Sequence, residues 1–262
     1  MANGWTELEI GEGRDPLPVR VYPYGTAKPR ALVLYLAGNA FRPAGQPQEE
    51  RPAARTLASI GAKVLEADYA GPEGVVFPGA VERAFEALKR LAAFRRQFVG
   101  PRTSIFVAGD EAGGNIAAGV ALKARDQMPG ELSGQILLSP LIDPQMATAS
   151  MREADAIGMR QRWSEGWSRY LQVPCGYGHP YAAPCQCSRL TGIAPALIMT
   201  AEDDPLRDEV KAYAARLKLA GVTVHRQVAP AASGWANLFK GRDGDWTEAV
   251  GKAFSAFLDD LK

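Results

Sequence analysis

The sequence predicts an α/β protein built on a mostly parallel β-sheet of eight strands, with helices on both faces. From residue 31 onward, short apolar segments alternate with longer amphipathic segments, which is the pattern of successive βαβ units. The length of 262 residues and the 47% hydrophobic content suffice for one large core. We therefore expect a single domain over residues 1–262.

The beginning of the chain predicts an antiparallel hairpin. Residues 5–10 and 19–24 alternate polar and apolar side chains, and glycine, aspartate and proline separate the two runs. The parallel part of the sheet then follows. In chain order we expect strand 31–36, helix 50–60, strand 63–67, helix 80–98, strand 104–107, helix 114–125, strand 135–138, a helical region 152–171, strand 196–200, helix 207–220, strand 222–228 and helix 247–261.

Charge and hydropathy exclude several classes of partner. The formal net charge is +1, and the basic residues are spread along the chain, so we expect no nucleic acid and no anionic membrane as partner. No apolar run approaches the roughly 18 residues of a membrane span, and the first residues lack the pattern of a signal peptide. We expect a cytoplasmic protein that binds a small-molecule ligand or substrate, without a cofactor.

The segment from Val107 to Asn115 is the most informative one. It lies between a strand-like and a helix-like run, and Gly109, Gly113 and Gly114 crowd the turn between them. Such a turn is typical of the G-x-S-x-G nucleophile elbow, in which neighbouring side chains would collide with a strained tip residue. The residue at the tip is Glu111, where the motif has serine.

Loops at the carboxyl ends of the expected strands hold the other candidate residues. They are residues 36–41, 201–209 and 229–235, in addition to the turn at 109–115. The order of turn, acidic loop and final loop matches the order of nucleophile, acid and base in α/β hydrolases.

On five motifs the chain resembles α/β hydrolases of the hormone-sensitive-lipase-like carboxylesterase family. The family's G-D-S-A-G-G-N differs from residues 109–115 only at the tip, and its D-P-L-R-D-E is unchanged at 204–209. Of its H-G-G-G-F, residues 37–41 keep only the first glycine and the phenylalanine, as A-G-N-A-F. Its Y-R-L-A-P-E…F-P and P-Y-A-S-P segments are echoed at 69–78 and 180–184. The resemblance runs from about residue 31 to the end and implies an α/β-hydrolase fold.

The resemblance also implies where a catalytic triad would lie. Glu111 takes the position of the nucleophile, Asp204 that of the acid, and Ser233 that of the histidine base in the family's H-G-F segment. The only histidines, His179 and His225, fall outside the loop that would hold the base. Without an imidazole, general-base assistance of roughly a hundredfold or more is lost. We therefore expect no ordinary serine-esterase activity.

The oxyanion loop is altered as well. The resemblance implies oxyanion-stabilising N–H groups at Gly38, Asn39 and Ala112, whereas Ala37 and Ala40 replace residues that the family uses there. The family also carries a cap formed partly by N-terminal helices. Here we expect only residues 143–180 to form a small cap, and the resemblance suggests a homodimer.

Three functional hypotheses follow. The first is a catalytically impaired pseudo-hydrolase that binds a small molecule or a protein partner in the inherited pocket. The second is an unconventional enzyme in which Glu111 is a carboxylate nucleophile, or acts with Asp204 as acid and base. In that case the helix N-terminus lowers the pKa of Glu111, burial and a nearby Asp204 raise it, and the sequence leaves the balance open. The third is an ester hydrolase whose tip residue has been altered.

Structural interpretations exist for the same residues. Asp204 followed by proline is typical of a helix N-cap. Glu111 would fill the old pocket or form a salt bridge with an arginine such as Arg42. The aromatic residues Trp163, Trp167 and Tyr170 have helical spacing, which favours packing in the core or lid over a ligand site.

Three cysteines, Cys175, Cys185 and Cys187, lie close to His179. An odd number of cysteines does not indicate a disulfide framework, and this spacing matches no standard zinc finger or ribbon. We expect free thiols in a loop, and no metal.

Overall fold

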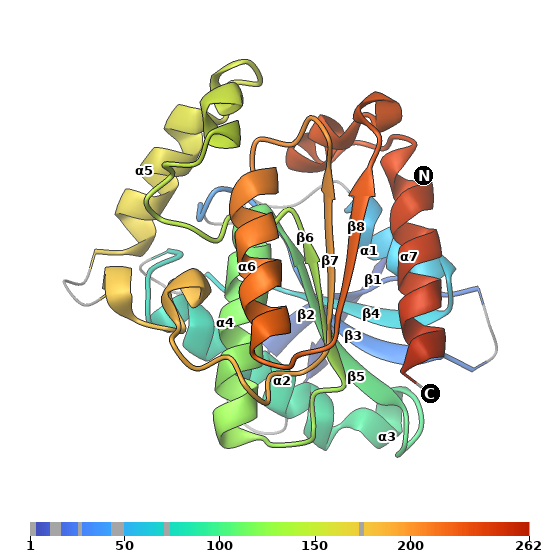
Figure 1. Ribbon diagram of the computed structural model, residues 1–262. Helices are drawn as coiled ribbons and strands as arrows, with labels where there is room; N and C mark the ends of the chain where they lie inside the picture. Colours follow the sequence, from blue (N-terminus) through green and yellow to red (C-terminus); the bar gives the residue numbers. More distant parts are fainter. Residues whose placement is uncertain are drawn as a thin grey trace.

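The computed structural model describes residues 4–10, 17–25, 28–42, 50–70, 74–172 and 176–261. These residues form one sheet in the order β1-β2-β4-β3-β5-β6-β7-β8 (Figure 1). The strands are β1 (Thr6–Ile10), β2 (Leu17–Val21), β3 (Ala31–Leu36), β4 (Ala62–Ala67), β5 (Ser104–Asp110), β6 (Gly134–Leu138), β7 (Ala196–Ala201) and β8 (Val224–Ala229).

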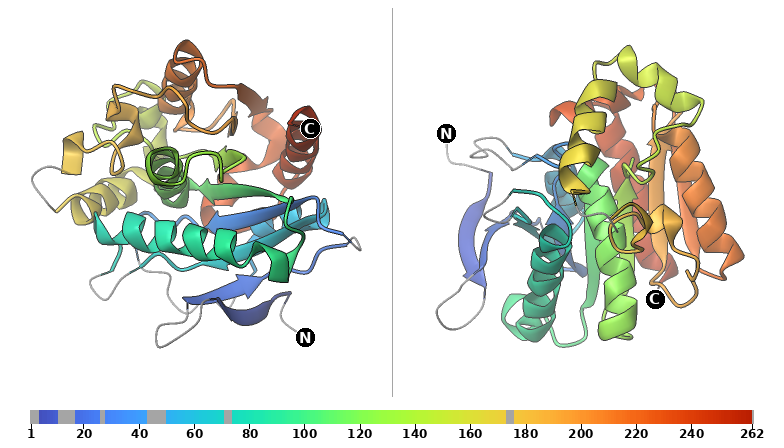
Figure 2. Two further views of the ribbon diagram at one scale, coloured as in Figure 1. Left: turned by 90° about the horizontal axis from the view of Figure 1, so that it is seen from below. Right: turned by 90° about the vertical axis from the view of Figure 1, so that its left-hand side faces the viewer.

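Helices cover both faces of this sheet. α1 and α7 pack against each other on one face, and α2, α4 and α6 cover the other (Figures 1 and 2). The helices are α1 (Pro52–Ser59), α2 (Gly79–Ala93), α3 (Arg95–Phe98), α4 (Glu111–Gln127), α5 (Arg160–Tyr170), α6 (Arg207–Leu219) and α7 (Trp246–Asp260), with short 3-10 helices η1 (Ser150–Asp155), η2 (Gly176–Gly178), η3 (Pro184–Gln186), η4 (Ala231–Ser233) and η5 (Trp235–Lys240).

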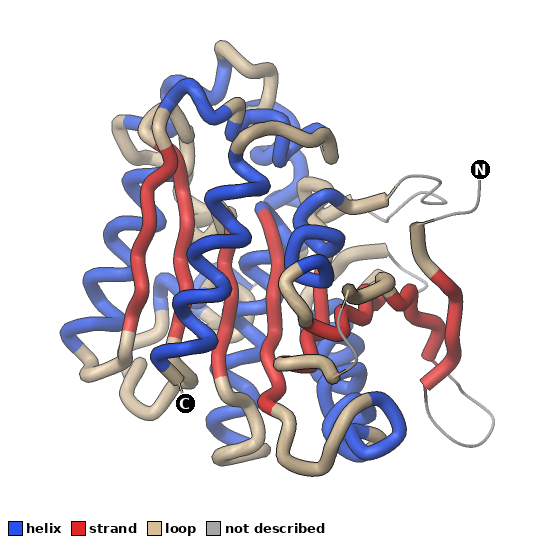
Figure 3. Tube along the Cα trace, turned by 90° about the vertical axis from the view of Figure 1, so that its right-hand side faces the viewer, coloured by secondary structure: helices blue, strands red, loops and turns tan. Residues whose placement is uncertain are grey.

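The predicted fold class is confirmed. β1 pairs with β2 antiparallel and β2 with β4 antiparallel, while every other neighbouring pair is parallel. The hairpin of β1 and β2 lies at one edge of the sheet (Figure 3). Every residue of β3, β6 and β7 is buried, which explains why these strands read as continuous apolar runs.

Several predicted boundaries were wrong. The helix expected over 80–98 is interrupted at Phe94, so that α2 and the short α3 replace it. The helical region expected over 152–171 is divided into η1 and α5, because Gly158 between them has a φ of 69°. The helix η5 was not expected. It lies between Gly234 and Gly241, both in the left-handed conformation.

The segment predicted to form the cap contains η1 and α5. α5 stands at one end of the sheet, apart from α4 and α6 (Figure 1). Residues 173–175 of the segment lie outside the described part of the chain, and its role as a cap stays a prediction. Among the residues described, none of the helices combines the length and the apolar character needed to cross a bilayer.

Candidate active site

Glu111 lies at a sharp turn between β5 and α4. It is the first residue of α4, and its φ of 50° lies in the left-handed region, which is unusual for a side chain of this size. A Cβ atom on Gly113 would overlap the carbonyl oxygen of Leu36 in β3, and one on Gly109 would overlap the carbonyl oxygen of Gly113. The glycines are therefore required by the close approach of three backbone segments.

The carboxylate of Glu111 faces the loop that follows β3. Its Oε2 accepts the backbone N–H of Ala40 at 2.9 Å, and its Oε1 accepts the indole N–H of Trp163 at 2.5 Å. Only 2% of Glu111 is exposed. The chain's own carboxylate thus occupies an N–H donor of the loop that the sequence predicted to stabilise an oxyanion.

Burial decides the ionisation of Glu111. It raises the pKa of this carboxyl above its usual range, and the negative charge of Asp110 adds to the rise. The hydrogen bonds from Ala40 and Trp163 and the charge of Arg162 lower the pKa, and together they do not offset burial. Burial therefore outweighs the interactions that lower the pKa of Glu111, a balance that the sequence alone did not decide.

Of the three N–H groups predicted for the oxyanion hole, that of Gly38 has another acceptor, and those of Asn39 and Ala112 stay predictions. The N–H of Gly38 donates to Asp110 Oδ1 at 3.1 Å, and the Asn39 side-chain oxygen accepts a hydrogen bond from Arg162 at 2.6 Å. Ala112 is buried in the first turn of α4. The donor that meets Glu111 is Ala40, which sequence reasoning missed because a backbone N–H leaves no mark in the side-chain pattern.

Asp204 lies after β7 and is 1% exposed. Its Oδ1 accepts the N–H of Leu206 at 2.9 Å, and its Oδ2 accepts the hydroxyl of Ser139. The interpretation of Asp204 as helix N-cap was wrong, because α6 begins at Arg207 with Leu206 as its N-cap. The carboxylate instead bonds the N–H two residues ahead and closes a separate turn before the helix.

A short chain of hydrogen bonds leads away from Asp204. The indole N–H of Trp235 donates to Ser139 Oγ at 2.7 Å, and Ser139 donates to Asp204. Trp235 and Ser139 are both fully buried. Neither was singled out in the sequence, since they are separated by 96 positions and only the fold brings them together.

Burial raises the pKa of Asp204 to about 6. The hydrogen bonds from Ser139 and Leu206 act in the opposite direction, and the charge of Asp203 adds to the rise. A carboxyl with this pKa changes its charge near neutral pH.

Ser233, the residue at the predicted base position, makes no comparable contact. It is 8% exposed, and its hydroxyl is buried without a hydrogen-bond partner among the described residues. Gly234, which follows it, has a φ of 67°. Within the described structure no hydrogen bond joins the side chains of Glu111, Asp204 and Ser233 to one another, and their roles as triad equivalents stay predictions.

Both histidines are placed by the structure. His179 Nδ1 accepts the N–H of Tyr181 at 3.2 Å, and His225, in β8, lies 3.5 Å from Asp260. Neither ring is bonded to Asp204 or Glu111.

Two further interpretations can be judged. Arg42 pairs with Glu165 at 3.0 Å, so the suggested salt bridge between Glu111 and Arg42 was wrong. The packing role of the aromatic residues on α5 is confirmed, because all three are buried and Trp167 and Tyr170 pack on the ring of Phe41 at 4.7 and 4.3 Å. Trp163 also has the polar role toward Glu111 described above.

A cavity of about 240 Å³ lies beside the loop that follows β3. Ala37 and Asn39 of that loop line it, whereas Glu111, Asp204 and Ser233 do not. Its walls are formed by Glu7, Pro18, Val19, Arg20, Ala37, Asn39, Arg42, Arg51, Glu66, Ala67, Asp68, Tyr69 and Val75.

The cysteine-rich loop is only partly described. Cys185 and Cys187 are free thiols, and Cys175 lies outside the described residues. In the ranges that the structure covers, no three His, Cys, Asp or Glu side chains are gathered so that they could hold a metal ion.

Comparison with known proteins points to one family. Residues 33–233 match the family described by the α/β-hydrolase fold. The chain is 32% identical over 227 residues to the carboxylesterase NlhH of Mycobacterium tuberculosis, covering 83% of this chain and 70% of the relative. It is 29% identical over 234 residues to an arylesterase of Saccharolobus solfataricus, covering 81% and 73%.

The solved structures agree with the sequence relatives. A thermostable carboxylesterase cloned from a metagenomic library superposes with a TM-score of 0.84 at 29% sequence identity, covering 98% of this chain and 89% of that one. The similarity therefore extends over nearly the whole chain, including the loops that hold Glu111 and Asp204.

Proposed function

Because the chain belongs to the α/β-hydrolase family, we propose that it is a member that has lost ester hydrolysis and binds a small molecule. The observation that carries this proposal is the position of the Glu111 carboxylate. An oxyanion hole stabilises negative charge with N–H groups that are unoccupied until the reaction begins. Here Ala40 already donates to a side-chain oxygen of Glu111, and the residue at the tip is not a hydroxyl.

The surroundings of Asp204 support the same proposal. In a triad the acid orients the base through a hydrogen bond to an imidazole N–H. Here both carboxylate oxygens of Asp204 accept other donors, from Ser139 and Leu206. The indole of Trp235 lies behind Ser139, so the acid has no histidine to orient and the neighbouring space is filled.

The burial of Glu111 disfavours the hypothesis of an unconventional enzyme. A carboxylate nucleophile has to reach a substrate carbon, yet Glu111 is 2% exposed and both of its oxygens accept a hydrogen bond. The small-molecule part of the proposal is supported by the cavity beside the same loop, which the side chain of Glu111 does not line.

Hydrolysis of 4-nitrophenyl acetate tests the loss of activity. We expect the unmodified chain to show no turnover above that of the matched variant Glu111→Gln. We expect Glu111→Ser alone to show little, because a serine without a base keeps its proton. The double variant Glu111→Ser, Ser233→His should gain a measurable rate, since general-base assistance is worth roughly a hundredfold or more.

Turnover by the unmodified chain that disappears in Glu111→Gln would instead identify Glu111 as a working nucleophile or base. Circular dichroism of each variant distinguishes a missing activity from a missing fold. Turnover that persists in Glu111→Gln but disappears in Asp204→Asn would likewise contradict the proposal.

A further inference from the structure

We infer that the cavity beside the loop after β3 binds a small carboxylate with a short apolar tail, held by the guanidinium groups of Arg20 and Arg51. This inference names the ligand class of the proposed small-molecule binding and rests on the proposed function in that respect alone. It does not depend on whether Glu111 is catalytically inert.

The two arginines share a single carboxylate. Glu66 Oε1 lies 3.8 Å from Arg20 Nη1 and 3.7 Å from Arg51 Nε, and both distances are too long for a hydrogen bond. The other oxygen of Glu66 accepts the hydroxyl of Tyr22 at 2.6 Å. Arg20 Nη1 and Arg51 Nε are buried and donate to no acceptor within the part of the chain that the structure describes. Asp110 contributes a second negative charge toward Arg51, and Glu7 lies opposite Arg20 in the pairing of β1 with β2. The unused donors, rather than a surplus of positive charge, therefore distinguish the two arginines.

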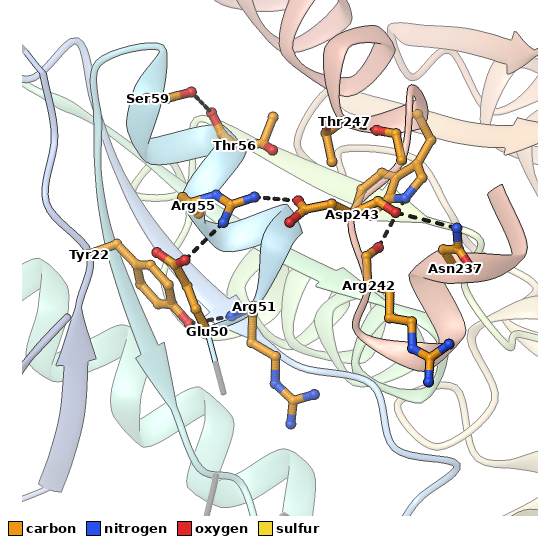
Figure 4. Close-up of polar contacts among 12 residues, drawn as sticks. Tyr22, Glu50, Arg51, Arg55, Thr56, Ser59, Asn237, Arg242, Asp243 and Thr247 are labelled. Carbon is orange, nitrogen blue, oxygen red and sulfur yellow. Dashed lines mark hydrogen bonds and ion pairs between the residues drawn. The ribbon is translucent and has the colours of Figure 1, made fainter. Parts of the chain in front are cut away.

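The carboxylates of Glu50 and Asp243 are bound by a different arginine. Arg55, one turn along α1, holds Glu50 at 2.9 Å and also pairs with Asp243 (Figure 4). In the same view the guanidinium of Arg51 points away from both carboxylates. The backbone N–H of Arg51 donates to the Tyr22 hydroxyl at 3.1 Å, which fixes the beginning of this segment against β2 and β4.

Two of the remaining charged groups of the lining, Asp68 and Arg42, have other partners, whereas Glu7 lies opposite Arg20 in the pairing of β1 with β2. Asp68 Oδ1 accepts the N–H of Ala70 at 2.8 Å, Arg42 pairs with Glu165, and Glu7 is exposed on β1. The lining thus contains three acidic and three basic side chains, but the unused buried donors belong to Arg20 and Arg51. A ligand that supplies acceptor oxygens for these guanidinium groups fits this arrangement.

The shape and polarity of the cavity define the ligand further. A carboxylate presents two oxygens, and planar guanidinium groups bind such a group through paired hydrogen bonds. Apolar side chains of Val19, Ala37, Ala67 and Val75 form the other walls. A volume of about 240 Å³ suits a small molecule. Butanoate has the charge, the size and the short tail that these walls would cover.

Isothermal titration calorimetry with butanoate tests the site, and butanamide is the matched neutral ligand of the same shape. We expect butanoate to bind the unmodified chain at least tenfold more tightly than butanamide. Arg51→Gln and Arg20→Gln should each weaken butanoate binding at least tenfold. Glu66→Gln should strengthen it, because the carboxylate that competes for both guanidinium groups is removed. Arg83→Gln, an equal change of charge on the exposed face of α2, should leave the affinity unchanged.

Absence of butanoate binding, or equal binding of butanoate and butanamide, overturns the inference. So does an affinity that changes with Glu111→Gln but not with Arg51→Gln, because that result places the ligand on the Glu111 side of the loop. If an arginine variant fails to fold, the stronger butanoate binding expected of Glu66→Gln still tests the inference. The ester assay is separate, so failure of the carboxylate site and failure of the proposed loss of hydrolysis give different results.

Discussion

At the scale of single residues, the candidate site is defined by the hydrogen bonds of two buried carboxyl groups. Glu111 accepts one backbone and one indole N–H, and Asp204 accepts one hydroxyl and one backbone N–H. Both oxygens of Glu111 and both oxygens of Asp204 thus accept a hydrogen bond, which is the condition under which burial of such a group is tolerated.

Replacement of Trp163 by phenylalanine removes the indole donor to Glu111 Oε1. An unsatisfied buried acceptor costs about 1–3 kcal/mol, so we expect Trp163→Phe to lower the free energy of unfolding by that amount beyond the loss of packing. The matched control is Trp167→Phe on the same helix, because the buried indole nitrogen of Trp167 has no hydrogen-bond partner among the residues described. Urea denaturation of both variants measures the difference, and equal destabilisation would show that the hydrogen bond contributes nothing.

Asp204 should make stability depend on pH. Its pKa is raised from 3.8 to about 6, so the folded state holds its proton where the unfolded state has released it. The stabilisation is complete below pH 4 and is lost as pH rises through 6. At about 1.4 kcal/mol per pKa unit, the unmodified chain should lose about 3 kcal/mol relative to Asp204→Asn between pH 4 and 7. Parallel denaturation curves at all pH values would contradict the prediction.

At the scale of elements, the position of α5 determines the surroundings of Glu111. α5 carries Trp163, and its Gly166 lies so close to the loop after β3 that an added Cβ would overlap the carbonyl oxygen of Ala40. The exposed pair Arg42 and Glu165 also joins this loop to α5. Such surface pairs contribute less than about 1 kcal/mol, so the close packing at Gly166 is the stronger constraint.

Gly166→Ala tests this packing. Alanine favours a helix over glycine by about 1 kcal/mol, so a destabilised variant would report the overlap with Ala40 rather than helix propensity. We expect a net loss of about 1–3 kcal/mol, as for overpacked interiors. Ser164→Ala, an exposed change on the same helix, should be neutral or slightly stabilising. A thermal melt of the two variants compares them directly, and a stabilised Gly166→Ala would exclude close packing at this point.

The sequence predicted the elements where local pattern determines them. The apolar runs of β3, β5 and β7 and the glycines around Glu111 were sufficient, because burial on both faces and a close backbone approach restrict the residue types. The hydrogen-bond partners of Glu111 and Asp204 could not be predicted from the sequence. Trp163 is 52 positions from Glu111 and Ser139 is 65 from Asp204, and no local rule relates residues so far apart.

At the scale of the whole molecule, the buried carboxyl groups all make stability depend on pH in the same direction. Burial raises the pKa of every buried aspartate and glutamate among the described residues. These are Glu66, Asp110, Glu111, Asp204 and Glu209. Since a raised pKa means that the folded state binds more protons than the unfolded state, stability falls as pH rises above the ordinary carboxyl range.

We therefore expect the midpoint of urea unfolding to decrease steadily from pH 5 to pH 8. The carboxyl groups with lowered pKa, such as Glu86 and Asp126, act below their ordinary values and do not offset this trend. The measurement is the midpoint at four pH values and constant ionic strength. A midpoint that rises over this interval would mean that burial does not raise the pKa of these carboxyl groups.

The carboxylate of Glu111 against Ala40 N–H also affects how the protein would behave in a cell extract. Electrophilic phosphonate probes label serine hydrolases by forming a bond to the nucleophile and placing their oxygen on the waiting N–H donors. Here the tip residue offers no hydroxyl, and Ala40 N–H is already taken. If the proposed loss of ester hydrolysis is correct, such probes should leave this chain unlabelled in a cell extract, although its fold belongs to the same family.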